Sequence, residues 1–354
     1  MELKDRIHAF AKLGIVLNKI SKKKGRRQGS NLEKLDQLVC DAFFHNGWFT
    51  EEYVRLAIEN IGKMIRSASM EGWLKPYEEE INKNEQSPKK IGVIMAGNIP
   101  LVGFHDMLCV LVAGHKFTGK LSSKDDKLLP AIADLLIEIE GGFSDKIEFT
   151  HDKLENADAI IATGSNNTSR YMEYYFGKYP HIIRKNRNSV AVLNGKETKE
   201  DLELLGHDIF TYFGLGCRNI SKLYLPKGYE LNRFFEGIVG FSKIMENNKY
   251  ANNFDYHRSI YLMDQIPFLE NNLIVLKEDP TLSSPVATLH YEFYTSTEEL
   301  ANQLKEEKDL IQCIVANQDC VINGSIPFGT TQQPVVNDYA DGIDTVQFLN
   351  SLGN

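Results

Sequence analysis

From residue 91 onward, short apolar runs alternate with segments in which apolar residues recur at helical spacing. The short runs predict strands and the longer periodic segments predict helices. Strands are predicted near 91–96, 116–121, 146–150, 158–162, 189–193, 222–225, 272–277, 286–294, 311–315 and 319–322. Such alternation predicts an α/β fold whose parallel sheet is covered on both faces. Because ligands of parallel sheets bind at the carboxyl ends of strands, the turns after 96, 121 and 162 are the expected binding positions.

The first 90 residues carry helical spacing only. Helices are predicted at 5–19, 31–44 and 51–66, with Asn31 and Thr50 as N-caps. Further helices are predicted at 101–114, 127–140, 165–176, 197–213, 229–246, 249–267 and 296–306. We therefore expect two α/β lobes. The first is 1–190, to which 326–354 returns, and the second is 191–325.

Charge and composition exclude several classes of protein. The 48 acidic residues exceed the 40 basic ones, which argues against nucleic acid as the main ligand. No segment is long and apolar enough to predict a membrane span, and the charged N-terminal residues do not resemble a signal peptide. The five cysteines, an odd number spread along the chain, predict reduced thiols and a cytoplasmic location.

Cys217 is a candidate nucleophile, since it lies in the run Gly214-Leu-Gly-Cys-Arg218. Glycine before a cysteine lets the backbone approach a substrate, and an adjacent cation favours the thiolate. The alternative is a small buried cysteine at a helix end. The remaining cysteines, which have apolar neighbours, are expected in the core: Cys40, Cys109, Cys313 and Cys320.

Three strand ends carry polar groups suited to binding. Asn98 follows the strand at 91–96, where its amide could donate to an oxyanion or simply stabilise a turn. Lys120 and the serines after it suit a ribose or a phosphate, although a solvated strand end has the same composition. Thr163-Gly164-Ser165 opens a helix, where exposed N–H groups suit a phosphate or where Ser165 is only an N-cap.

Several common motifs are absent from the sequence. There is no G-x-G-x-x-G after a strand, no P-loop, and no paired His or Cys at metal-ligand spacing, so we expect no metal site. The basic run 22–27 is expected to be a solvated loop, or else a contact to a polyphosphate such as coenzyme A.

In order, these pieces resemble the motifs of the aldehyde dehydrogenase superfamily. The matching segments are Gly97-Asn-Ile-Pro100, Ala113-Gly114, Lys120-Leu-Ser-Ser123, Thr163-Gly-Ser165, Gly216-Cys217, Ser284-Pro-Val286 and Ile326-Pro-Phe-Gly329. The resemblance covers about 91 to 345. The short length, the Gly-Leu-Gly-Cys-Arg run and the helical N-terminus are similar to acyl-CoA reductases of the LuxC type, which belong to fatty acid reductase systems. The resemblance implies an aldehyde-dehydrogenase-like fold with a cofactor lobe and a smaller catalytic lobe.

Three departures from the family pattern refine what the resemblance implies. Val192 stands where hydrolytic members carry the glutamate that activates water, which favours a thioester reductase over an aldehyde oxidase. Thr281 stands near the position of the glutamate that binds the nicotinamide ribose. Ser123 replaces the carboxylate that selects NAD, and Lys124 follows it, so we expect NADP(H).

The resemblance also implies residue roles. Cys217 would attack an acyl-CoA thioester, while the Asn98 amide and the Cys217 N–H hold the oxyanion. Thr163, Gly164 and Ser165 would bind the cofactor pyrophosphate. Lys120 and Ser122, with Ser123, would bind the adenosine ribose.

Two other functions remain open from the sequence. An acyl-phosphate reductase of the semialdehyde type would use the same cysteine with a phosphate leaving group. A non-catalytic binding protein of the same fold would need no reactive Cys217. The expected partners are acyl-CoA or an acylated protein donor, with a homo-oligomer or an acyl-transfer partner as further possibilities.

Overall fold

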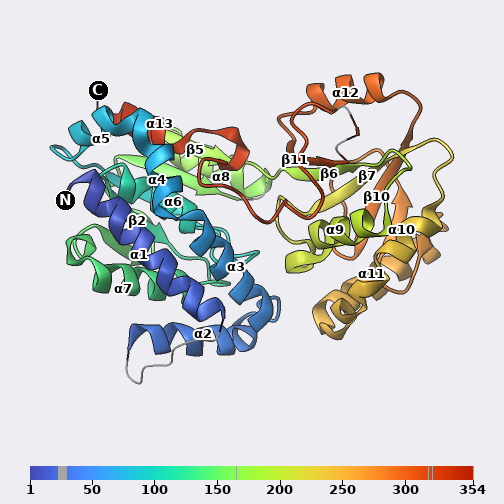
Figure 1. The fold of residues 1–354 in the computed structure, drawn as a ribbon, viewed down its shortest axis with the longest axis horizontal. Coiled ribbons are helices and arrows are strands. Elements are labelled where there is room, and N and C mark those ends of the chain that lie inside the picture. The colour runs from blue at the N-terminus through green and yellow to red at the C-terminus, as the bar shows by residue number, and fades with distance from the viewer. Residues whose placement is uncertain (23–29, 165, 318, 321, 354) are drawn as a thin grey trace. The chain divides into compact units, whose positions relative to one another are not determined.

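The computed structural model describes residues 1–22, 30–164, 166–317, 319–320 and 322–353. The chain forms two compact units, each with its own sheet (Figure 1). The first unit consists of Met1–Asn186 and Pro334–Asn354, and the second of Arg187–Gln333. The α/β fold class predicted from the alternating pattern is confirmed.

The first unit contains a five-stranded parallel sheet with the order β3-β2-β1-β4-β5. Its strands are β1 (Lys90–Ile94), β2 (Lys116–Lys120), β3 (Ile147–Thr150), β4 (Ala159–Thr163) and β5 (His181–Arg184). The four strands β1 to β4 confirm the prediction. β5 was not predicted, because a segment of four residues that mixes polar and apolar side chains carries too little periodicity.

Helices surround this sheet (Figure 1). They are α1 (Leu3–Ser21), α2 (Asn31–His45), α3 (Glu51–Met64), α4 (Ser67–Leu74), α5 (Glu78–Asn84), α6 (Phe104–Val112), α7 (Leu128–Ile139), α8 (Asn166–Phe176) and α13 (Thr345–Asn350). Short 3₁₀ turns lie at Lys75–Tyr77, Gly141–Phe143, Ala340–Gly342 and Ser351–Gly353. α1 packs on α3, α4 and α7, so the helical N-terminus belongs to this unit.

The N-caps of two of these helices were predicted from the sequence. The Thr50 side chain accepts from the N–H of Tyr53 (3.3 Å), which confirms it as the cap of α3. The prediction of Asn31 was wrong by one residue, because Ser30 is extended and accepts from the N–H of Glu33 (3.3 Å). Either side chain can cap a helix, so spacing alone did not choose between them.

The second unit contains a six-stranded sheet with the order β11-β6-β7-β10-β9-β8, parallel except for the short β8. Its strands are β6 (Asn188–Val192), β7 (Ile220–Pro226), β8 (Leu269–Glu270), β9 (Val275–Glu278), β10 (Thr288–Tyr294) and β11 (Ile311–Ala316). Its helices are α9 (Lys199–Phe210), α10 (Leu231–Gly237), α11 (Asn248–Met263) and α12 (Thr297–Glu306), with 3₁₀ segments at Thr211–Gly214 and Val239–Glu246.

Two predictions for this unit were wrong. The helix predicted at 229–246 divides into α10 and a 3₁₀ segment, with Ile238 between them. Among the described residues of 319–322, none forms a strand. In both segments the apolar residues pack in the core, although the backbone forms neither one continuous helix nor a strand. Cys320 and Ile322, for example, belong to a hydrophobic cluster of this unit.

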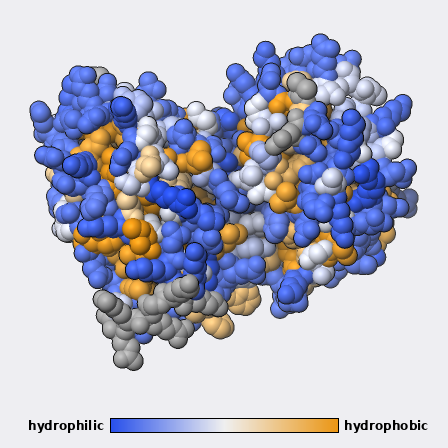
Figure 2. Space-filling view, in the orientation of Figure 1, coloured by the Kyte–Doolittle hydropathy of each residue, from blue (hydrophilic) through white to orange (hydrophobic). Residues whose placement is uncertain are grey.

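The molecular face in Figure 2 is mostly hydrophilic, with hydrophobic residues in separate small groups. No helix in the described part of the chain is long and apolar enough to cross a membrane.

Candidate active site

The turns after β1, β2 and β4 lie at one edge of the first unit's sheet. Ile94, the last residue of β1, pairs with Lys120 of β2 on one side and with Ala162 of β4 on the other. The strand order reverses between β1 and β4, and ligands of open α/β sheets bind outside the carboxyl ends of strands at such a reversal. The structure therefore brings the turn that carries Asn98 and the strand ends Lys120 and Thr163 to one edge.

The turns after β1 and β2 are in close contact. A Cβ atom on Gly97 would lie 2.5 Å from Oγ of Ser122, so a larger side chain would push the two turns apart. The Asp125 carboxylate accepts from the N–H of Leu101 (2.8 Å), whose φ of +62° is unusual for a residue other than glycine. Burial raises the pKa of Asp125 to about 6. Asp125, which the sequence did not single out, therefore helps to hold the turn that follows Asn98.

The predicted binding residues of this edge differ in exposure. Asn98 and Ser123 are exposed, whereas Lys120, Ser122, Thr163 and Gly164 are half-buried. Ser165 lies outside the described residues, as does most of the basic run 22–27.

In the second unit, the helix that precedes Cys217 ends earlier than predicted. The sequence predicts a helix to 213, but α9 ends at Phe210. Tyr212 and Phe213 then have φ values of +54° and +59°, and Gly214 has +74°. Such left-handed conformations cost residues other than glycine about 1–2 kcal/mol each, and only the surrounding structure can hold them. The two aromatic side chains continue the apolar spacing of the helix, so the sequence pattern did not reveal the change to a left-handed backbone.

The Asn219 side chain stabilises this left-handed segment. Its Nδ2 donates to the carbonyl oxygens of Asp208 (3.0 Å), Ile209 (3.4 Å) and Thr211 (2.8 Å), at the end of α9. Its Oδ1 accepts from the N–H of Gly216 (2.8 Å). Because the side chain is buried, it has few alternative partners. Sequence reasoning missed Asn219, although asparagine is common in turns that leave the helical region.

Cys217 lies in the turn that Asn219 closes. The N–H of Asn219 donates to the carbonyl oxygen of Gly216 (3.0 Å), and Oγ of Ser189 donates to the carbonyl oxygen of Cys217 (2.8 Å). The Cys217 side chain is exposed, so the alternative of a buried cysteine is wrong. The other cysteines are buried or half-buried: Cys40, Cys109, Cys313 and Cys320.

The cation next to Cys217 contacts a second sulfur. Nη1 of Arg218 donates to Sγ of Cys313 on β11, at 3.2 Å. The N–H of Cys313 in turn donates to Oγ of Ser189 (3.1 Å), the hydroxyl that also holds Cys217. The turn that carries Cys217 is thus joined to β11 through one hydroxyl and one guanidinium.

A buried carboxylate joins α9 to the segment that carries Pro327-Phe-Gly329. Asp208 accepts from the N–H of Gly329 (2.6 Å) and from both the N–H (3.0 Å) and the hydroxyl (2.7 Å) of Thr331. Burial raises the pKa of Asp208 above its usual value. Asp208 was not predicted, because the two segments are far apart in sequence.

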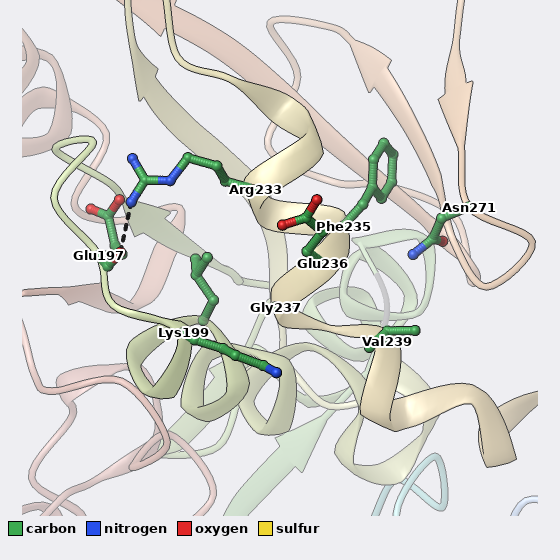
Figure 3. A pocket seen from close by; sticks show the side chains of 9 residues that line it. Glu197, Lys199, Arg233, Phe235, Glu236, Gly237, Val239 and Asn271 are labelled. Carbon is green, nitrogen blue, oxygen red and sulfur yellow. Dashed lines mark hydrogen bonds between the residues drawn. The ribbon is translucent and has the colours of Figure 1, made fainter.

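A cavity of about 590 Å³ lies beside α9 and α10 (Figure 3). Arg233 in its wall donates to the carbonyl oxygens of Gly195 (2.7 Å) and Glu197 (2.9 Å). The Glu197 carboxylate accepts from the N–H groups of Asn194 (2.6 Å) and Gly195 (3.1 Å). The partners of these charged groups are backbone atoms, so the groups stabilise the turn after β6.

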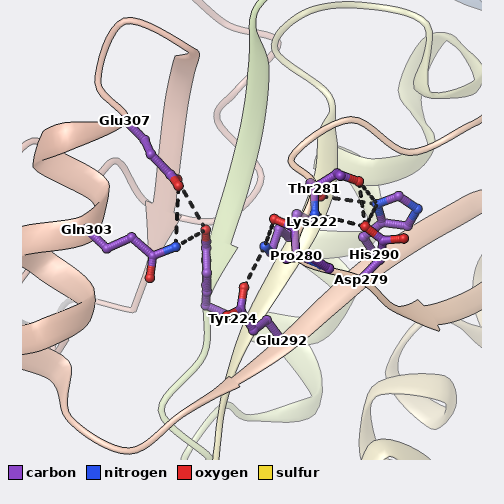
Figure 4. A network of polar contacts seen from close by, with 9 residues as sticks. All are labelled: Lys222, Tyr224, Asp279, Pro280, Thr281, His290, Glu292, Gln303 and Glu307. Carbon is purple, nitrogen blue, oxygen red and sulfur yellow. Dashed lines mark hydrogen bonds and ion pairs between the residues drawn. The ribbon is translucent and has the colours of Figure 1, made fainter.

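Polar side chains of β7 and β10 hold the loop 279–282, which contains Thr281 (Figure 4). Three consecutive carbonyl oxygens have side-chain partners: Pro280 with Nζ of Lys222 (2.6 Å), Thr281 with Nδ1 of His290 (3.1 Å) and Leu282 with Oγ of Ser221 (2.7 Å). The buried Lys222 also pairs with Glu292 (2.7 Å). The loop is therefore fixed by groups that the sequence pattern did not identify.

Neither a protein-family model nor a curated protein matches this sequence. Solved structures do match. Aldehyde dehydrogenase 21 from Physcomitrella patens, in complex with the reaction product succinate, has a TM-score of 0.65 at 12% identity, over 99% of this chain and 88% of that chain. The chain has the aldehyde dehydrogenase fold.

Two further structures with this fold are similar. The NAD-dependent aldehyde dehydrogenase from Sinorhizobium meliloti has a TM-score of 0.62 at 11% identity, over 91% of this chain and 76% of that chain. The 1-pyrroline-5-carboxylate dehydrogenase of Thermus thermophilus has a TM-score of 0.58 at 11% identity, over 99% and 80%. The predicted aldehyde-dehydrogenase-like fold is thus confirmed.

Proposed function

We propose that this chain reduces an acyl thioester to the aldehyde, with NADPH as the reductant and Cys217 as the nucleophile. The observation that carries the proposal is the exposed Cys217 in a turn held by buried side chains. Similar solved structures are aldehyde dehydrogenases, one of them NAD-dependent, which supports an oxidoreductase that acts at the aldehyde oxidation level. The motif resemblance to acyl-CoA reductases supports the thioester as substrate.

The first chemical step is acyl transfer to sulfur. The Cys217 thiolate attacks the thioester carbonyl carbon, the bond to the leaving sulfur breaks, and the donor departs as a thiolate. The N–H of Cys217 and the exposed amide of Asn98 are the proposed donors to the developing oxyanion. Ser189 fixes the carbonyl side of Cys217 and so restricts rotation of the peptide plane that follows.

We assign a phosphorylated dinucleotide to the carboxyl edge of the first unit's sheet, where a lysine and hydroxyl groups follow neighbouring strands. NADPH, when bound, supplies the hydride that releases the acyl group as aldehyde. The N–H groups of 163–165 are proposed to hold the pyrophosphate, and Lys120 and Ser122 the ribose. Ser123 and Lys124 are both exposed, and a hydroxyl beside an ammonium group tolerates a 2′-phosphate that a carboxylate would repel.

The environment of Val192 supports reduction over hydrolysis. Val192 ends β6 with its side chain fully buried in an apolar cluster. A valine cannot take a proton from water, so the acyl-cysteine would persist until hydride or another acceptor reaches it.

Intact-mass measurement tests the covalent step. The protein is mixed with medium- and long-chain acyl-CoA without NADPH, digested and analysed for acylated peptides. We expect one acyl group on Cys217, none in Cys217→Ser, and unchanged acylation in Cys40→Ser. Acylation at another cysteine, or none from any chain length, would contradict the proposal.

Donor and cofactor are tested by turnover. Absorbance at the NADPH band is followed with acyl-CoA, acylated carrier protein and acyl phosphate, each with NADPH or NADH. Faster turnover of acyl phosphate would instead indicate a semialdehyde-type reductase.

A further inference from the structure

A second cavity, of about 530 Å³, lies in the second unit among residues of α12, β11 and the segment 322–324, and no step described above uses it. Its apolar wall contains Leu304, Ile311 and Ile322, which are buried members of one hydrophobic cluster. The volume is within the range of small-molecule sites.

The rest of the wall is polar and cationic. Lys305 and Lys308 are exposed at the cavity, and three amide side chains line it: Asn302, Gln312 and Asn323. Among the described residues that form this wall there is no carboxylate. Ammonium groups attract phosphate, and side-chain amides both donate and accept hydrogen bonds. The wall therefore suits a ligand with apolar carbon, amide groups and a phosphate.

The cavity is next to the nucleophile turn. Cys313 lines it, and Oγ of Ser189 bridges the N–H of Cys313 (3.1 Å) and the carbonyl oxygen of Cys217 (2.8 Å). The Arg218 guanidinium donates to Sγ of Cys313 (3.2 Å) from the residue after the nucleophile. One side chain thus separates the cavity wall from the backbone of Cys217.

We propose that this cavity binds the 4′-phosphopantetheine arm of the thioester donor, an inference that rests on the proposed function. The arm carries its thioester sulfur at one end, then amide groups, a dimethyl-substituted carbon and a phosphate. The sulfur end lies toward Cys217, the amides meet Asn302, Gln312 and Asn323, and the phosphate meets Lys305 and Lys308. Coenzyme A and acyl carrier protein share this arm, so one site serves either donor.

Charge reversal at the cavity tests the phosphate contact. In the double variant Lys305→Glu/Lys308→Glu we expect the KM for acyl-CoA to rise about 10- to 100-fold with kcat unchanged, because charge-assisted hydrogen bonds are lost. Acyl-pantetheine, which has no phosphate, should keep its KM. The matched control Lys227→Glu/Lys243→Glu changes exposed lysines of the same unit that lie outside the cavity and should alter neither. Equal effects on both thioesters, or no effect, would overturn the inference.

Two further measurements separate the possible failures. Calorimetric titration of Cys217→Ala with pantetheine 4′-phosphate reports binding without turnover, so the inference is tested even if the proposed reaction fails. We expect measurable binding, and we expect the double variant to weaken it by the same factor as it raises the KM for acyl-CoA. The absence of measurable heat would contradict the proposed site. Acylated carrier protein should lose affinity together with acyl-CoA. A loss for acyl-CoA alone would mean that the lysines contact the nucleotide part, which contradicts binding of the arm.

Discussion

Asn219 offers the sharpest test of how the turn that carries Cys217 is built. The substitution Asn219→Ala removes the acceptor of the Gly216 N–H and the donor to the carbonyl oxygens of Asp208, Ile209 and Thr211. Alanine is small enough to leave the packing around it in place but offers no hydrogen bond.

The magnitude follows from the two shortest of these contacts, both 2.8 Å, to the N–H of Gly216 and the carbonyl oxygen of Thr211. A buried polar group that loses its partner costs about 1–3 kcal/mol. Asn219 is only 3% exposed, so water cannot readily replace it. We expect the free energy of unfolding to fall by about 3 kcal/mol, a large part of the 5–15 kcal/mol typical of a protein.

The assay combines stability and reactivity. Urea unfolding gives the free energy, and mass spectrometry of the Cys217 peptide gives the rates of alkylation by iodoacetamide and of acylation by acyl-CoA. Acylation should slow by at least about tenfold, because the Cys217 N–H, the proposed donor to the oxyanion, is displaced. Alkylation should change less than about twofold, since the Cys217 side chain is already exposed.

Asn253→Ala is the matched control. It removes one exposed hydrogen bond, from Nδ2 to the carbonyl oxygen of Lys249 (2.8 Å), and should cost less than about 0.5 kcal/mol. If Asn219→Ala loses less than about 1 kcal/mol, or if it slows acylation and alkylation equally, Asn219 does not hold the turn as described.

Four other substitutions give further predictions. Cys217→Ser should reduce acyl-CoA turnover about a thousand-fold or more, measured by NADPH absorbance, and a rate near that of the unmodified protein would exclude the covalent step. Burial raises the pKa of Asp125 to about 6. The folded protein therefore binds the carboxyl proton of Asp125 more tightly than the unfolded chain does, and the free energy of unfolding falls as pH rises from about 4 to about 6. Asp125→Asn should therefore gain up to about 3 kcal/mol relative to the unmodified protein between pH 4 and pH 7, and parallel urea midpoints across that range would refute this. Asp208→Asn should lose about 2 kcal/mol, because an amide N–H would face the donors of Gly329 and Thr331. Thr331→Val, which removes one of these donors, should lose about 1 kcal/mol, and a larger loss than in Asp208→Asn would contradict the assignment.

The resemblance to the aldehyde dehydrogenase motifs predicts the fold from the sequence alone. Apolar periodicity identified most strands of both sheets, because each strand buries its own residues and is visible within a few positions of sequence. Local pattern failed at β5 and at the end of α9. β5 is too short to show a period. After Phe210, two buried aromatic residues keep the apolar spacing while the backbone becomes left-handed.

The sequence by itself determined the alternating α/β order and the positions of Cys217 and of the polar strand ends, because these depend on neighbouring residues. Only the tertiary structure decided that Cys217 is exposed, that Asn219 and Ser189 hold its turn, and that Cys313 on β11 adjoins it. These contacts join residues up to 124 positions apart. No local pattern encodes such a contact, since its stability arises only when the sheet has brought the strands together.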